Sequence, residues 1–195
     1  MGNDIVSVTE AILKEIPECC RLSEKDIEKL FSLRPYLYPL EDRLVKGFYD
    51  VLYGYPPTAS IFELSEREKR EWTLRNWWRR TIDGPFDLHY WTWQAAVGII
   101  HIRRKVKNPM MIGMWAWILN FIGKELSKIL SYDEFTKVLE AFHKLAATAE
   151  ALTAESYLHH YLLALCLATG TDLQLIDRLV LIELEQVQEI LSQKS

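Results

Sequence analysis

Apolar residues recur at steps of three and four positions along most of the chain, which is the spacing of one face of an α-helix. The pattern is clear in the stretch 37–54, where the apolar positions include Leu40, Leu44, Phe48, Val51 and Leu52. Strand-like alternation is rare by comparison. The hydrophobic pattern therefore predicts an all-α protein of about seven or eight helices with short connections.

Helix-starting and helix-breaking residues divide this pattern into segments. Ser65 with Glu68 has the spacing of a capping box, and Ser23 and Ser131 are also expected to cap helices. The sequence DGP at 83–85 is a strong break. The expected helices cover about residues 4–16, 23–33, 37–54, 65–82, 86–105, 108–130, 131–168 and 171–191, with a short helical turn at 58–62.

Length and segment order predict how the chain is organised. A chain of 195 residues is long enough to bury a substantial core. No internal repeat and no low-complexity linker separates one part from another. We therefore expect a single domain over residues 1–195, with its core at about 23–168 and a C-terminal helix at about 171–191.

Charge and cysteine content exclude several classes of protein. The chain has 23 Lys and Arg against 27 Asp and Glu, whereas a nucleic-acid-binding protein should show a basic excess. Its longest apolar runs, 110–122 and 161–168, are too short to cross a bilayer. Three cysteines, two of them adjacent, fit neither a disulfide framework nor a zinc knuckle. We expect a cytoplasmic protein with no nucleic-acid partner and no membrane span.

One histidine lies on an apolar helix face. On a helix over 86–105, Tyr90, Trp93, Val97 and His101 fall near one side, with Ile100 beside them. Such a histidine can be a core residue bonded to a backbone carbonyl, which is the commoner case. It can also be the axial ligand of a haem iron, for which one neutral imidazole is enough. The residues alone leave both interpretations open.

Aromatic residues near this helix have two interpretations as well. Five of the seven tryptophans fall between Trp72 and Trp93, so a large flat group is packed there or the core is rich in aromatic residues. Trp77 and Trp78 could line a cofactor cavity or fill a core. Tyr53 could place its hydroxyl beside a bound ligand, or lie at the surface with the hydroxyl in water.

The order of several motifs resembles the sensor domain of globin-coupled sensors and their single-domain relatives, the protoglobins. The matching segments are FYDVLYGYPPTA (48–59), LRNWW (74–78), IDGPFDLHY (82–90) and VGIIHIR (97–103), followed by the apolar PMMIGMWAW (109–117). The helix expected at 4–16 also fits the extra N-terminal helix of that family. The helix at 171–191 is longer than the family leads us to expect.

The resemblance implies a globin fold that binds haem b, with an extra N-terminal helix. The apolar pattern adds a C-terminal helix to this fold. It implies His101 as the proximal iron ligand and Tyr53 as the distal-pocket tyrosine. It also implies Leu74 and Trp78 on the distal side and Phe62 near the haem edge. The other residues expected at the cofactor are Trp77, Val97 and Ile100. The sequence departs from the family at Gln94-Ala95-Ala96, where an arginine is often found. Contacts of that arginine with the haem propionates therefore cannot be transferred.

The implied function is reversible binding of a diatomic gas (O2, CO or NO) by a sensor or carrier, with no turnover required. One alternative is a haem enzyme, such as a peroxidase, a nitrite reductase or an NO dioxygenase. The sequence shows no second distal histidine or arginine suited to O–O cleavage, which disfavours it. The other is a haem-free signalling globin, which the presence of His101 disfavours. We also expect a homodimer paired through the last long helices; the alternative is intramolecular packing of their apolar faces.

Overall fold

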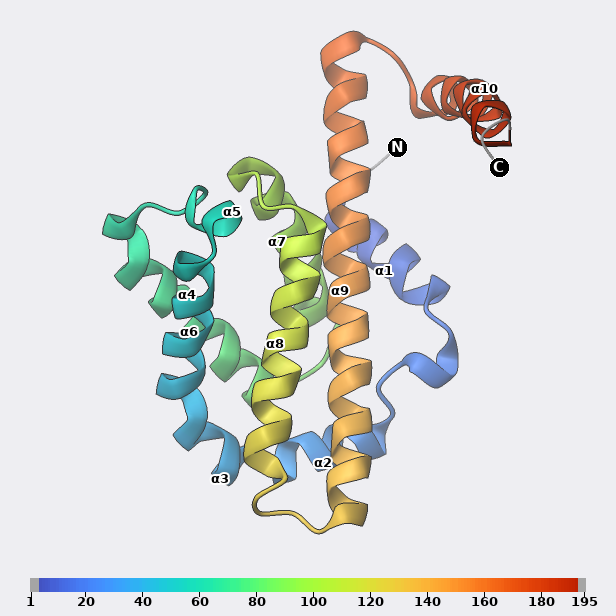
Figure 1. Ribbon diagram of the computed structural model, residues 1–195. Coiled ribbons are helices and arrows are strands. Elements are labelled where there is room, and N and C mark those ends of the chain that lie inside the picture. Colours follow the sequence, from blue (N-terminus) through green and yellow to red (C-terminus); the bar gives the residue numbers. More distant parts are fainter. Residues whose placement is uncertain (1–3, 193–195) are drawn as a thin grey trace. The chain divides into compact units, whose positions relative to one another are not determined.

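The computed structural model describes residues 4–192, with side chains described as far as residue 185. The described residues are helical and contain no strand, which confirms the all-α prediction (Figure 1). The helices are α1 (Ile5–Glu15), α2 (Glu24–Ser32), α3 (Arg34–Leu37), α4 (Glu41–Gly54), α5 (Pro56–Ala59), α6 (Arg67–Asp83), α7 (Leu88–Arg104), α8 (Asn108–Leu126), α9 (Tyr132–Thr169) and α10 (Leu173–Ser192). Short 3-10 turns cover Glu18–Cys20, Tyr38–Leu40 and Leu64–Glu66.

The chain divides into two compact units, and the boundary falls inside α9. The first unit extends to Tyr157 and the second begins at Leu158. In the first unit, α4 packs against α6 and α8, and α1 packs against α7. The core of this unit is formed by side chains of α4, α7, α8 and the first part of α9, among them Leu44, Ala95, Ile122, Leu145 and Leu152.

Two of the three predicted helix starts are present. Ser23 and Asp26 form a capping box at the start of α2. Ser131 and Glu134 exchange backbone and side-chain hydrogen bonds at the start of α9. The capping box expected at Ser65 is wrong, because Ser65 lies inside a 3-10 turn and its hydroxyl donates to the Glu63 carboxylate at 3.3 Å.

The helix expected over 37–54 is shorter than predicted. It begins at Glu41, and the preceding residues form a 3-10 turn that contains Pro39. Proline has no backbone N–H to donate and cannot continue a regular helix from the residues before it. Apolar spacing alone does not predict this change, because Leu37 before the turn and Leu40 at its end both still pack in or against the core.

Helix α7 lies against the backbone of α9. A Cβ atom at Gly98 would lie 2.5 Å from the carbonyl oxygen of Thr153 and 2.8 Å from the backbone nitrogen of Tyr157. Both contacts are with backbone atoms, so no side-chain rotation could relieve them. Glycine at this position therefore allows α7 to approach α9 closely, one helical turn before His101.

Helix α6 is held to α4 by charged side chains. Glu41 accepts hydrogen bonds from Arg75 and Arg79, at 2.7 and 2.6 Å. Near the other end of the pair, Arg67 donates to Asp50 at 2.7 Å. The Arg79 and Arg75 hydrogen bonds lower the pKa of Glu41, against the opposing effect of its burial.

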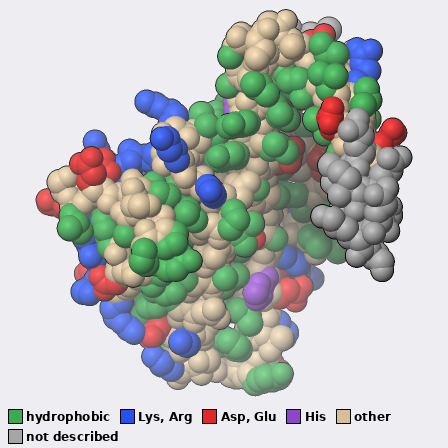
Figure 2. Space-filling model, turned by 45° about the horizontal axis from the view of Figure 1, so that its top comes forward, with side chains coloured by type: hydrophobic (Ala, Val, Ile, Leu, Met, Phe, Trp, Pro, Cys, Tyr) green, Lys and Arg blue, Asp and Glu red, His purple; other side chains and the backbone are tan. Residues whose placement is uncertain are grey.

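The second unit contains the end of α9 and the helix α10. Gly170, with a φ of 70°, ends α9, and the Asp172 side chain accepts a hydrogen bond from the backbone of Leu175 as α10 begins. Several leucines of this unit are exposed, including Leu167 and Leu181, and green hydrophobic side chains are visible at the upper right of Figure 2. No helix in the described part of the chain combines the length and apolar character needed to cross a bilayer.

Candidate functional site

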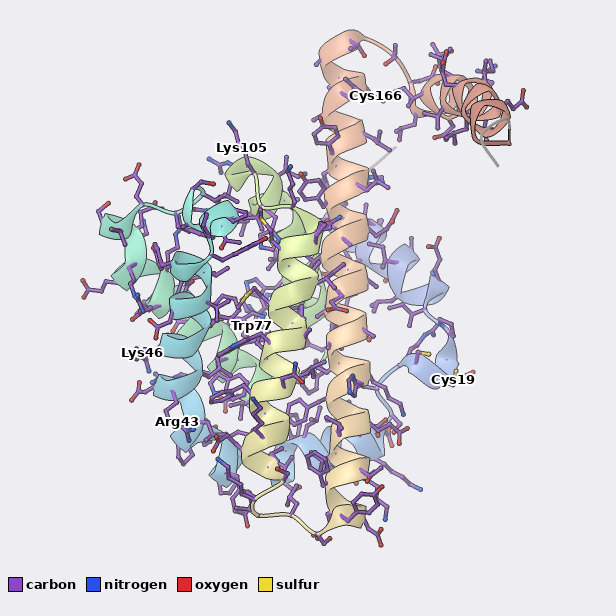
Figure 3. The ribbon with its side chains drawn as sticks, in the orientation of Figure 1. Cys19, Arg43, Lys46, Trp77, Lys105 and Cys166 are labelled. Atoms are coloured by element: carbon purple, nitrogen blue, oxygen red, sulfur yellow. The ribbon has the colours of Figure 1, made fainter. Side chains whose placement is uncertain are left out.

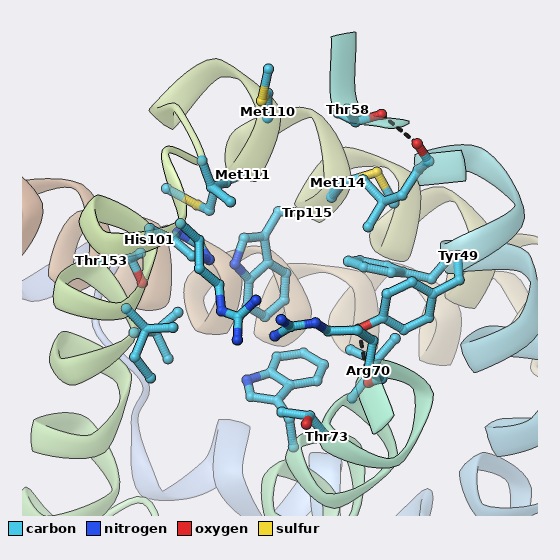
Figure 4. A pocket seen from close by; sticks show the side chains of 18 of the residues that line it. Tyr49, Thr58, Arg70, Thr73, His101, Met110, Met111, Met114, Trp115 and Thr153 are labelled. Carbon is cyan, nitrogen blue, oxygen red and sulfur yellow. Dashed lines mark hydrogen bonds between the residues drawn. The ribbon is translucent and has the colours of Figure 1, made fainter. Parts of the chain in front are cut away.

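A cavity of about 270 Å³ lies within the first unit. This is close to the lower end of the range typical of ligand pockets, about 300–1,000 Å³. Residues of α4, α6, α7 and α8 line it, with Thr153 of α9 at one side (Figure 4). Most lining side chains are aliphatic, aromatic or methionine, so the cavity suits a largely apolar ligand.

His101 lines this cavity from the last turn of α7. Its Nδ1 is buried and has no hydrogen-bond partner in the protein. Burial lowers the pKa of His101 to about 4, so the imidazole is neutral near neutral pH. A core histidine bonded to a backbone carbonyl would show a partner for the buried nitrogen. A neutral imidazole on an apolar cavity instead has the protonation state that a haem ligand requires.

Five other residues expected at the cofactor line the same cavity. They are Phe62, Leu74, Trp77, Val97 and Ile100. Trp77 points toward the interior of this unit, whereas Lys46 points outward from α4 (Figure 3). The Trp77 indole N–H donates to Gln94 at 3.4 Å, and its ring packs edge-on against Trp115. Helices α6 and α7 therefore each supply side chains to one apolar pocket, as the motif order suggested.

The structure does not place Trp78 at the cavity. Trp78 is only 2% exposed and belongs to the packed core. Trp78 follows Trp77 on α6 and points about 100° further round the helix, toward the packed core. The pair is divided between two tasks, with Trp77 at the cavity and Trp78 in the core.

The structure places Tyr49, and not Tyr53, at the cavity. Tyr53 is half-buried, and its hydroxyl donates to the Glu63 carbonyl at 3.1 Å. Tyr49, one turn earlier on α4, is buried, and its hydroxyl donates to the Arg70 carbonyl at 2.8 Å. Burial raises the pKa of Tyr49, so the phenol stays protonated. Spacing could not separate the two phenols, because residues four positions apart lie on the same side of a helix.

Helix α8 supplies a part of the lining that was not assigned from the sequence. Met111, Met114, Trp115 and Ile118 project from it into the cavity, together with Met110. These positions recur at helical spacing within the apolar segment 109–118, which is the signal that could have identified them. Methionine side chains adapt to irregular shapes, so this wall can fit closely around a ligand.

Charged residues also line the cavity. The sequence predicts no distal arginine, yet Arg70 and Arg104 both belong to the lining. Arg70 Nη2 donates to both carboxylate oxygens of Glu66, at 3.1 Å each, and Arg104 lies 3.8 Å from the same carboxylate. The Nε of Arg70 is buried and has no hydrogen-bond partner. Arg70 was missed because α6 is rich in charge, and nothing in the pattern separates an inward arginine from its solvent-facing neighbours.

Comparisons with known proteins agree with the motif order. A family model described as Protoglobin matches residues 9–162. Among solved structures, the globin domain of the Geobacter sulfurreducens globin-coupled sensor is similar, with a TM-score of 0.68 and 25% sequence identity. That match covers 74% of this chain and 97% of the other. No curated protein matches the chain. The resemblance to this family and the globin fold are both confirmed.

Proposed function

We propose that this chain, which belongs to the protoglobin family, binds haem b between α6 and α7 and reversibly binds a diatomic gas as a sensor or carrier. Membership of a globin family implies haem; the type of haem, the gas ligand and the residues assigned to them are our proposal. The observation that carries it is the neutral His101 imidazole on the wall of an apolar cavity. Its Nδ1 lacks the hydrogen bond that a core histidine would make.

The residues present fit such a group. His101 would hold it through its imidazole, with Val97 and Ile100 on the same helix and Leu74 and Trp77 on α6. When bound, haem supplies an iron atom that takes up O2, CO or NO reversibly. The low pKa of His101 keeps the imidazole neutral at neutral pH, so one ring nitrogen is unprotonated and could hold the metal.

The other lining residues control water and polarity. The aromatic and methionine side chains exclude water, which in globins slows oxidation of the iron. Tyr49 places a phenol on this surface, with its proton donated to the Arg70 carbonyl and its oxygen lone pairs free to accept. We therefore assign to Tyr49 the pocket position that the sequence suggested for Tyr53.

The test is haem binding by His101→Ala compared with native protein. Native protein titrated with haemin should give a Soret band that shifts when CO is added to the reduced protein. His101→Ala should lose the haem or the axial bond, because no other imidazole lines the described cavity. His143→Ala, an exposed histidine on α9, is the matched control and should bind as the native protein does. An unchanged haem content and spectrum in His101→Ala would remove the proposal.

Assembly and location are further parts of the proposal. Leu158, Tyr161 and Leu165 are exposed on the last part of α9, and exposed apolar patches mark interaction sites. This supports a homodimer paired through the last long helices, which the molecular mass in solution tests. A cytoplasmic location stays a prediction. A haem-free signalling role would require a colourless protein that takes up no haem on titration.

A further inference from the structure

The strongest hydrogen-bond donors at the cavity differ in whether they are already engaged. The Tyr49 hydroxyl donates to the Arg70 carbonyl, and the Trp77 indole donates to Gln94. The Tyr53 hydroxyl, on the same helix as Tyr49, donates to Glu63. The Nε of Arg70 is buried and engages no acceptor. Among the donors that α4 and α6 contribute to the lining, Arg70 is therefore the one described with an unengaged nitrogen.

The side chain of Arg70 is held in the cavity by Glu66. It is only 11% exposed, and Nη2 donates to both oxygens of the Glu66 carboxylate. Figure 4 shows the Arg70 side chain extending into the cavity, with His101 among the residues on the other side. Helices α6 and α7 thus present Arg70 and His101 to the same cavity.

Two arginines and one glutamate lie together at one side of the cavity. Arg70 and Arg104 bring two positive charges, and Glu66, the carboxylate that both approach, brings one negative charge. Arg70 is the more buried of the two cations, with 11% of its side chain exposed against 36% for Arg104, and it lies beside apolar side chains of the lining. A charge in such surroundings is costly unless it is paired, and a bound anion would pair it.

We propose that Arg70 makes the ligand site opposite His101 selective for small anions, by donating from its guanidinium to an anion bound at the haem iron. This inference rests on the proposed haem binding and extends the ligands of that site from neutral gases to anions of the size of fluoride, azide or nitrite. Glu66 has two effects on this site: it orients Arg70 and it offsets part of its charge.

The experiment uses the full chain loaded with ferric haem, and fluoride as the probe. Fluoride affinity is measured by absorption titration, and CO affinity of the reduced protein is measured as the neutral-ligand comparison. Arg70→Leu should weaken fluoride binding by about 10- to 150-fold, the range for a hydrogen bond to a charged group. CO affinity should change by less than about 3-fold, since a neutral ligand gains little from the cation. Arg70→Lys, which keeps the charge, should fall between Arg70→Leu and the native protein.

Two further variants separate an electrostatic role from a structural one. Glu66→Gln removes the negative charge and keeps a hydrogen-bonding side chain, so fluoride should bind about 2- to 10-fold more tightly. Arg67→Leu removes the same charge from the same helix, at a residue that pairs with Asp50 and does not line the cavity. Its fluoride affinity should stay within about 2-fold of native, because solvent screens this partly exposed charge.

Each other outcome overturns the inference in a recognisable way. If Arg67→Leu weakens fluoride binding as much as Arg70→Leu does, the loss comes from the general charge or stability of α6 and not from a contact made by Arg70. If Arg70→Leu loses haem affinity while the remaining haem protein binds fluoride normally, Arg70 holds a haem propionate. If the native protein takes up no haem, the proposed function fails and this inference fails with it. A stable haem protein with native fluoride affinity in Arg70→Leu removes this inference alone.

Discussion

Helices α6 and α7 both line the cavity, and they are held in place by different kinds of interaction. Nine of the 17 residues of α6 carry a charged side chain, and several pair with acidic residues of α4. Only two of the 17 residues of α7 are charged, Arg103 and Arg104 at its end. Helix α7 is instead positioned by the contact of Gly98 with the backbone of α9.

This difference divides the cavity into a fixed side and an adjustable side. A contact that a Cβ atom would violate at 2.5 Å permits little movement, since packed backbones deform at high cost. Ion pairs across a partly exposed surface are worth little each and respond to pH and salt. The helix that carries His101 is thus positioned by close packing against the backbone of α9. The helix that carries Arg70 is placed by charges.

The largest expected effect comes from filling the space at Gly98. Gly98→Ala should lower the free energy of unfolding by about 3 kcal/mol, because the added methyl group meets two backbone atoms. Urea unfolding followed by circular dichroism measures this change. Haem uptake by the same variant reports whether His101 has moved with the displaced helix.

Gly113→Ala is the matched control for that substitution. Gly113 lies inside α8, and a Cβ there would have no atom within 4 Å. Alanine is the better helix former, so this variant should be more stable by about 0.5–1 kcal/mol. Equal stabilisation by both substitutions would show that α7 has room for a side chain beside α9. It would contradict the statement that close backbone packing fixes the position of α7.

A smaller effect is expected from the charged side. Glu41→Gln should lower the free energy of unfolding by about 2 kcal/mol, because Arg75 and Arg79 lose a carboxylate partner. Asp42→Asn is the control, since Asp42 also pairs with Arg75 but its side chain is 86% exposed. It should change stability by less than about 0.5 kcal/mol.

The Glu41 effect should depend on pH with a known sign. The folded-state pKa of Glu41 lies below its ordinary value of 4.5, so the carboxylate stabilises the fold above pH 4.5. That contribution is lost as the pH falls through the folded-state pKa. The stability difference between native protein and Glu41→Gln should therefore shrink in acid. A difference that persists unchanged there would mean that shape, and not charge, holds α6.

The smallest expected effect is at Tyr49, which links α4 to α6 through a hydrogen bond between uncharged groups. Tyr49→Phe removes the hydrogen bond to the Arg70 carbonyl and should cost about 1 kcal/mol. Tyr53→Phe, which loses a hydrogen bond from a half-buried phenol to the carbonyl of the exposed Glu63, should cost less, about 0.5 kcal/mol. Unfolding curves at neutral and acid pH should show the same Tyr49 difference, unlike that of Glu41. A larger loss in Tyr53→Phe would contradict the placement of the two phenols.

Much of the fold could be predicted because it depends on local patterns. Apolar spacing located most helices, and Ser23 and Ser131 located two starts. His101 could be identified as a candidate because its helix face is otherwise apolar, and motif order linked it to a family. Pro39 shows the limit of this approach, since it divides a stretch whose apolar pattern continues without interruption.

The remaining part of the site depends on contacts between distant segments. Tyr49 and Tyr53 are one turn apart on α4, so only the position of α6 decides which phenol meets the cavity. In the sequence, Arg70 cannot be distinguished from the other charged residues of α6. Only the fold places it beside Glu66 and in the lining of the cavity. The requirement for glycine at position 98 comes from residues 153 and 157, which no local pattern connects to it.

The Nδ1 of His101 has one more implication for a metal held at this imidazole. A ligating histidine is normally steadied and made more electron-rich by an acceptor on its second nitrogen. No protein group does this here, so the tilt of the ring is decided by the side chains stacked around it. A metal held by this imidazole would therefore have a weakly donating ligand, whose ring orientation would follow small shifts of the surrounding methionines and tryptophans.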